Sequence, residues 1–145
     1  MKIQARRLAI VFGLSLWVAA GVSRAEVPRT ASESGAKVYF IQPINGATIK
    51  GPVKVVMGLA GMGVAPAGTD AANTGHHHLI VDAKTPPADG VIPIDANHRH
   101  FGKGQTETTL ELPPGKHTLQ LVFADKNHIP HNPPVVSEVI TITVE

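Results

Sequence analysis

The chain has 145 residues, of which 43% are hydrophobic and 17% charged, so it has the length and composition of one folded domain. Thirteen Lys and Arg residues against 11 Asp and Glu residues give a formal net charge of +2, and there is no Cys. The lack of Cys excludes a disulfide scaffold, a thiolate metal site, an iron–sulfur cluster and a Cys nucleophile. The eight His residues are the one compositional excess.

The N-terminus has the pattern of a secretory signal peptide. Basic side chains precede an apolar run over residues 8–22, and the small residues Ser23 and Ala25 suit cleavage after Ala25. We therefore expect residues 1–25 to be removed on export to the periplasm, which leaves no stable membrane anchor. The remaining chain would carry nine basic residues against 11 acidic ones, a net charge of −2. Without a basic stripe, nucleic-acid binding is not expected.

The rest of the chain has the pattern of a short leader followed by strands. Residues 26–36 are small and polar, and we expect a flexible leader there. From residue 37 onward, β-branched and apolar runs are separated by Gly, Pro and Asn, and no amphipathic helix is visible. The pattern predicts an all-β domain over residues 37–145, an immunoglobulin-like antiparallel β-sandwich of about seven strands. The expected strands cover residues 37–44, 53–60, 76–82, 91–94 (short and weak), 105–112, 117–125 and 136–144.

Seven of the eight His residues lie in three short clusters. The first is the run His76-His77-His78, where the two-residue period of a strand places His76 and His78 on one face and His77 on the other. The second cluster, His98 and His100, has the same spacing, and the third is the pair His128 and His131 in a loop that begins at Asp125. In a sandwich, the loop before the 76–82 strand and the loop after the 117–125 strand lie at the same end. The first and third clusters are therefore expected to meet.

Converging imidazoles indicate a metal site, because neutral imidazole binds zinc, copper, nickel and iron. Copper or zinc is the expected ion. The predicted ligands are His76, His78, His128 and His131, with His98, His100 and Asp125 in reserve.

Three segments carry a resemblance to a known family. The sequences GHHHLIVD, HFGKGQTETTLELPPGKHTLQLVFAD and HIPHNPPVVSEVITITV resemble a family of secreted bacterial domains of unknown function, of the DUF4399 type. The resemblance implies a small all-β periplasmic domain and brings no activity with it.

A looser resemblance is to the periplasmic β-sandwiches of copper resistance. In that family a Leu-Pro-Gly turn opens a strand that ends in Asp followed closely by His, and these residues help to hold copper. Leu112, Pro113 and Gly115 match the turn here, and Asp125 and His128 match the ligands. That family also uses a histidine at the mature N-terminus, so His76 and His78 would have to take its place here.

Other interpretations remain open at this stage. The domain could be a metal-free immunoglobulin-like binding or structural module, in which the His side chains form a polar network. It could be a metal-assisted hydrolase with a base such as Glu107, or a sensor of pH. Two His residues have a structural interpretation of their own. His77 is expected to pack or pair across strands, and His117 to hydrogen-bond a loop carbonyl.

Overall fold

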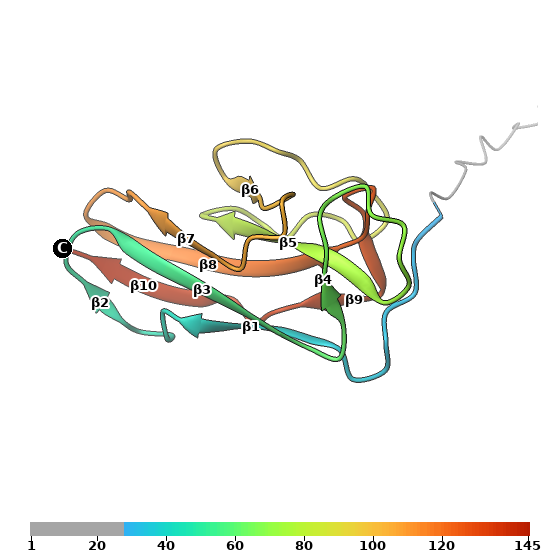
Figure 1. Ribbon diagram of the computed structural model, residues 1–145. Coiled ribbons are helices and arrows are strands. Elements are labelled where there is room, and N and C mark those ends of the chain that lie inside the picture. The colour runs from blue at the N-terminus through green and yellow to red at the C-terminus, as the bar shows by residue number, and fades with distance from the viewer. Residues whose placement is uncertain (1–27) are drawn as a thin grey trace, which may run out of the picture.

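The computed structural model describes residues 28–145 (Figure 1), and these residues form strands and loops without a helix. Two facing sheets form a β-sandwich, which confirms the predicted all-β class. The expected signal peptide, residues 1–25, lies outside the described residues. Within the described part of the chain, no segment forms an apolar helix long enough to cross a membrane.

The smaller sheet has three antiparallel strands in the order β1-β3-β7. They are β1 (Lys37–Gln42), β3 (Val53–Ala60) and β7 (Glu107–Leu110). In β3, Val53, Val55 and Met57 alternate with more exposed residues and are buried. This period of two is that of a sheet with one face on the core.

The larger sheet has seven strands and is built around β8 (Gly115–Ala124) and β5 (Thr74–Val81). Its main path runs β2-β10-β8-β5-β4, with β6 added beside β5 and β9 beside β8. All pairs are antiparallel except β2 with β10 and β4 with β5. The remaining strands are β2 (Thr48–Ile49), β4 (Gly63–Val64), β6 (His98–His100), β9 (Pro130–Val136) and β10 (Ile140–Val144).

The larger sheet is buried on both of its faces. On the inner face, Leu119, Leu121 and Phe123 of β8 pack in the core between the sheets. On the outer face, Val122 and Ala124 join a second, smaller cluster with Ile92. Ile92 belongs to the segment between β5 and β6, which arches over this face (top of Figure 1). The outer face is therefore covered by connecting segments rather than by a third sheet.

Two of the expected strands need correction, and β9 lies where the sequence predicts a loop. Residues 91–94 form no strand, because Ile92 is instead buried against the outer face, where its N–H donates to the carbonyl of His128. The expected strand over 136–144 is two strands, the end of β9 and all of β10, with a break at residues 137–139. Most of β9 falls in a segment that the sequence predicts as a loop, and its Pro130, Pro133 and Pro134 lack the N–H that a strand uses.

The leader makes defined contacts with the domain. Ala31 pairs with Asn132 in a parallel bridge, and hydrogen bonds run in both directions between residues 30–32 and Asn132. Residues 30–32 therefore extend the sheet edge at the start of β9.

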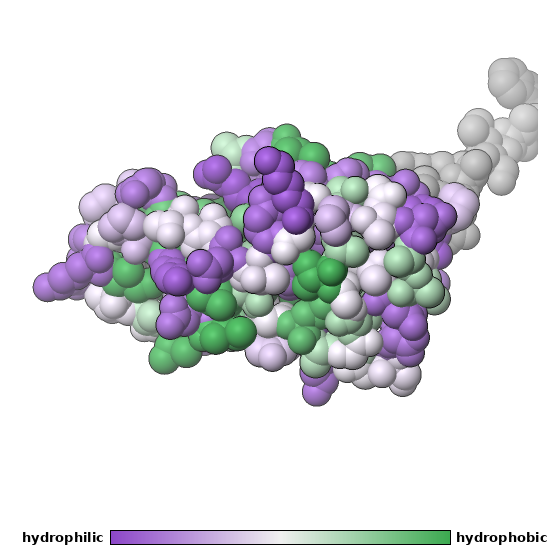
Figure 2. Space-filling model, viewed as in Figure 1, coloured by the Kyte–Doolittle hydropathy of each residue, from purple (hydrophilic) through white to green (hydrophobic). Residues whose placement is uncertain are grey.

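An apolar region lies away from the connecting segments, on the face shown in Figure 2. Figure 2 shows hydrophobic residues at the lower edge of the view, on the side where β1 and β2 lie. Tyr39, Ile41 and Ile44, in β1 and the turn after it, are the exposed large hydrophobic residues of this region. It lies on the smaller sheet, so it is separate from the His-rich outer face described next.

Candidate metal centre

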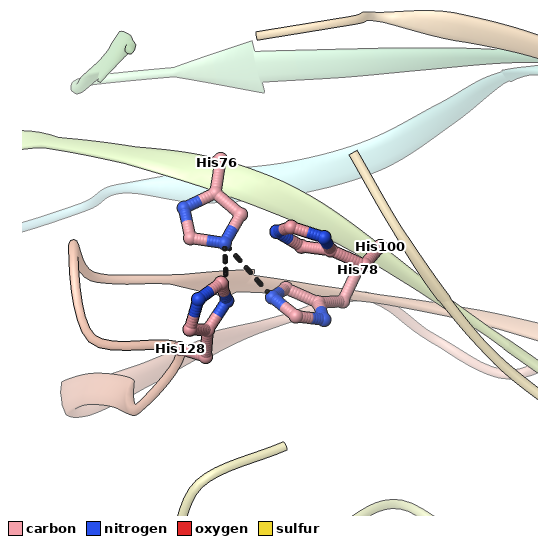
Figure 3. Close-up of side chains that lie close together, drawn as sticks. All are labelled: His76, His78, His100 and His128. Carbon is pink, nitrogen blue, oxygen red and sulfur yellow. Dashed lines mark hydrogen bonds between the residues drawn. The ribbon is translucent and has the colours of Figure 1, made fainter. Parts of the chain in front are cut away.

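Four His side chains from three parts of the chain converge on the outer face of the larger sheet (Figure 3). His76 and His78 come from β5, His100 from the end of β6, and His128 from the loop after β8. One ring nitrogen of each residue lies within 4.8 Å of the corresponding nitrogens of the other three. We call these four residues the histidine cluster.

Strand geometry places three members of the cluster. His76 and His78 are two residues apart on β5, so both project from the outer face, opposite Ala124 and Val122 of β8. On the other side of β5, β6 is antiparallel and places His100 directly across from His78. Residues directly opposite in an antiparallel pair have neighbouring side chains on the same face. The two HxH motifs therefore meet because β5 and β6 are adjacent.

A tight loop supplies the fourth member. β8 ends at Ala124, and the chain turns back at Asp125 so that His128 lies beside β5. His128 has a φ of 63°, in the left-handed region that few non-glycine residues adopt. Its Nδ1 lies 3.2 Å from Nε2 of His76, and the same His76 nitrogen lies 3.0 Å from Nε2 of His78.

Burial and the neighbouring imidazoles lower the pKa of three members of the cluster. Burial lowers the pKa of His76 to about 4, with further lowering by His128 and His100. Burial, and then the neighbouring His76, lowers the pKa of His78 to about 2. Burial and His128 also lower the pKa of His100. At neutral pH these three imidazoles are therefore uncharged, which is the form that binds a metal.

Hydrogen bonding alone leaves the cluster unsatisfied. A single ring nitrogen either donates one proton or offers one lone pair, so Nε2 of His76 cannot bond fully to both of its neighbours. Three ring nitrogens of the cluster are also buried without a hydrogen bond: Nδ1 of His76, Nδ1 of His78 and Nε2 of His100. The nitrogens that approach one another can therefore be satisfied only in part by hydrogen bonds, and a ligand at the centre would take up their free lone pairs.

The spacing fits a tetrahedral ion. Zinc–imidazole bonds of roughly 2.0–2.1 Å at tetrahedral angles put ligand nitrogens about 3.3 Å apart. The two separations of 3.0 and 3.2 Å are close to that value, and all four nitrogens lie within 4.8 Å of one another, so the four imidazoles could hold one ion.

The other predicted ligands lie outside the cluster. His131 is on β9 and points into the main core, where its ring stacks on Phe123 with centroids 5.8 Å apart. His98 is on β6, but its Nδ1 lies 2.8 Å from a carboxylate oxygen of Asp95. Both carboxylate oxygens of Asp125 accept hydrogen bonds from the protein. Of the seven predicted candidate ligands, four converge, and His98, Asp125 and His131 do not.

The structural interpretations of the two remaining His residues are confirmed. His77 faces the main core and packs edge-on against Phe123, with ring centroids 5.2 Å apart. Nε2 of His117 lies 2.8 Å from the carbonyl of Pro113, and its Nδ1 lies 2.7 Å from a carboxylate oxygen of Asp82. The bond to Asp82, followed by the bond to Pro113, raises the pKa of His117.

All four members of the histidine cluster were among the predicted candidates, although His100 was held in reserve and His131 was ranked above it. The sequence carried a signal for His100, namely the HxH spacing that it shares with β5. The missing information was that residues 98–100 form a strand next to β5. His131 lies on β9, in a segment that the sequence predicts as a loop, and a loop gives no rule for the face that its side chain takes.

These features define a class: an all-β sandwich with a four-histidine cluster on the outer face of its larger sheet. A family model for a domain of unknown function, DUF4399, matches residues 55–145, and the chain belongs to that family. This confirms the family resemblance noted in the sequence.

Other similarities are weak. No curated protein matches the chain. Among solved structures, the endo-beta-1,4-mannanase from Thermotoga petrophila is similar at 20% identity and a TM-score of 0.44 over 76% of this chain. The chain spans only 20% of the mannanase's length.

Proposed function

We propose that this protein is a periplasmic metal-binding β-sandwich that holds copper or zinc through His76, His78, His100 and His128. Its role is metal handling or tolerance rather than catalysis. The periplasmic location rests on the signal-peptide pattern of residues 1–25. The metal rests on the geometry of the histidine cluster.

One observation carries the proposal: ring nitrogens of four imidazoles from three parts of the chain lie within 4.8 Å of one another, and hydrogen bonds among them satisfy them only in part. A metal-free polar network would need those nitrogens to find donors and acceptors inside the protein. A bound ion instead takes up a lone pair from each converging imidazole at the same point.

The choice of handling over catalysis rests on the ligand set. Sites with four protein ligands are coordinatively closed, whereas catalytic zinc sites keep a position open for water or substrate. The histidine cluster contains no carboxylate that could act as a base. Glu107, the base considered for a hydrolase, lies on the smaller sheet in an ion pair with Lys54.

Thermal unfolding of the untagged protein tests the proposal, since a His tag would bind metal itself. One equivalent of Cu(II) or Zn(II) should raise the unfolding midpoint above that in EDTA, because an ion bound only by the native state stabilises it. The double variant His76→Ala/His78→Ala should lose this rise. The matched control His98→Ala, which removes a nearby His outside the cluster, should keep it. A wild-type midpoint that neither ion changes would contradict the proposal.

A further inference from the structure

The position of His128 depends on Asp125. The carboxylate Oδ1 of Asp125 accepts hydrogen bonds from the N–H groups of Asn127 and Ile129, at 2.8 and 3.1 Å. The backbone of Asp125 also receives the N–H of His128 and donates to the carbonyl of Ile129. These bonds close the loop around His128, whose left-handed backbone few non-glycine residues adopt without such support.

The second oxygen of Asp125 is held by the N-terminal segment. Its Oδ2 accepts a hydrogen bond of 2.8 Å from the hydroxyl of Thr30. Asp125 is only 2% exposed, so water has little access to replace that bond. With both oxygens engaged by the protein, Asp125 is directed away from metal binding and toward shaping the loop.

The N-terminal segment is itself anchored, on the opposite side, to the start of β9. The guanidinium of Arg29 donates to the carbonyls of Pro130 and His131. Asn132 N–H donates to the carbonyl of Thr30, and Ser32 N–H donates to the carbonyl of Asn132. Residues 29–32 therefore form a strap that ties β9 to the loop carrying His128.

We propose, on the basis of the proposed function, that this strap positions a ligand of the metal site: Thr30, acting through Asp125, is a positioning residue for the ligand His128. When residues 29–32 are docked, His128 is fixed as the fourth ligand. Without the hydrogen bond from Thr30, the loop holds His128 less firmly, and the ion depends on the three imidazoles of β5 and β6. The strap thus contributes to metal affinity.

The test compares Thr30→Val, which removes only the hydroxyl, with Ser32→Ala, which removes a hydroxyl from the same strap that bonds Pro133 and not Asp125. Zn(II) affinity of the untagged full chain is measured by competition with a chelator. Thr30→Val should weaken binding about tenfold, as loss of a bond that orients a ligand does. Ser32→Ala should bind as the wild type does.

A double-mutant cycle separates positioning from general stability. In a His128→Ala background, Thr30→Val should cause no further loss of Zn(II) affinity, because the ligand that it positions is absent. The electron paramagnetic resonance spectrum of the Cu(II) complex should shift in Thr30→Val toward that of His128→Ala. In the metal-free protein, amide exchange at His128 and Ile129 should become faster in Thr30→Val, while exchange in the β8 core stays unchanged.

The outcomes distinguish the strap from the site. Normal Zn(II) binding by the wild type together with unchanged affinity in Thr30→Val would overturn the positioning role of the strap and leave the proposed function intact. An equal further loss in the His128→Ala background would overturn it too. Absence of Zn(II) and Cu(II) binding by the wild type would overturn both.

Discussion

Buried histidine nitrogens without partners distinguish this protein at the scale of single residues. Seven such ring nitrogens lie among the described residues, on His76, His77, His78, His100 and His131. In the histidine cluster, the atoms of His76 and His78 that approach each other are Nε2, so an ion at the centre would leave the Nδ1 of each without a partner. His77 and His131 face the main core, outside the cluster, so their unpaired nitrogens are a cost to folding.

His77 gives a prediction of that cost. Replacing it with Leu should raise the free energy of unfolding by about 1–2 kcal/mol in EDTA, because two unsatisfied buried nitrogens are replaced by an apolar side chain of similar size. The contrast is His117→Leu, which should destabilise the protein because both ring nitrogens of His117 are bonded. Urea unfolding at pH 7.5 measures both variants. Destabilisation by His77→Leu would show that its ring has a partner.

At the scale of elements, the site depends on which strands are neighbours. The strand period alone predicted that His76 and His78 share a face and that His77 is opposite, and the structure agrees. The adjacency of β6 to β5 could not be predicted, because β6 has three residues and its pairing is a tertiary contact. β9 was missed for a different reason: its prolines signal a loop, yet they lie at an edge where missing N–H groups are tolerated.

The chain after β6 gives a prediction at this scale. A Cβ placed on Gly102 would overlap the ring of His100, so the absence of a side chain at this glycine leaves room for that ring. Gly102→Ala should therefore displace His100 and weaken Zn(II) binding about tenfold without altering any ligand. Gly90→Ala is the matched control, since its Cβ would meet no atom within 4 Å. Equal affinities in a chelator competition would remove His100 from the ligand set.

At the scale of the whole molecule, the two faces of the larger sheet have different roles. The inner face and the smaller sheet form the main apolar core, and the outer face carries the histidine cluster beneath connecting segments. The sandwich class followed from composition and alternating runs. The covered outer face did not, because segments of irregular structure cover it through contacts such as that of Ile92 with His128.

The metal-free protein is predicted to lose stability in mild acid. Burial lowers the pKa of five His residues below the usual value of about 6.5 that they regain on unfolding, so the unfolded chain binds more protons below that pH. Stability is therefore full above about pH 6.5 and falls as the pH drops toward 4. These residues are His76, His77, His78, His100 and His131.

His117 acts in the opposite direction, because its raised pKa gives stability that is present below pH 6.5 and is lost as the pH rises through its folded value. The stability that this one residue contributes in acid does not offset the loss from the five residues with lowered pKa values. For His77, whose pKa is lowered to about 4, the loss between pH 6.5 and pH 5 is about 1.5 kcal/mol. Urea unfolding in EDTA at pH 7.5 and pH 5 measures the total. A free energy of unfolding that is equal or higher at pH 5 would contradict the assignment of these residues as buried and neutral.

X-ray absorption at the metal K-edge tests the central claim most directly, on untagged protein loaded with one equivalent of copper or zinc. The structure predicts a first shell of about four nitrogens, at roughly 2.0–2.1 Å for zinc, with the outer-shell scattering of imidazole rings. The variant His76→Ala/His78→Ala should lose that shell. A wild-type first shell made mainly of oxygen, or one without imidazole scattering, would contradict a metal site in the histidine cluster.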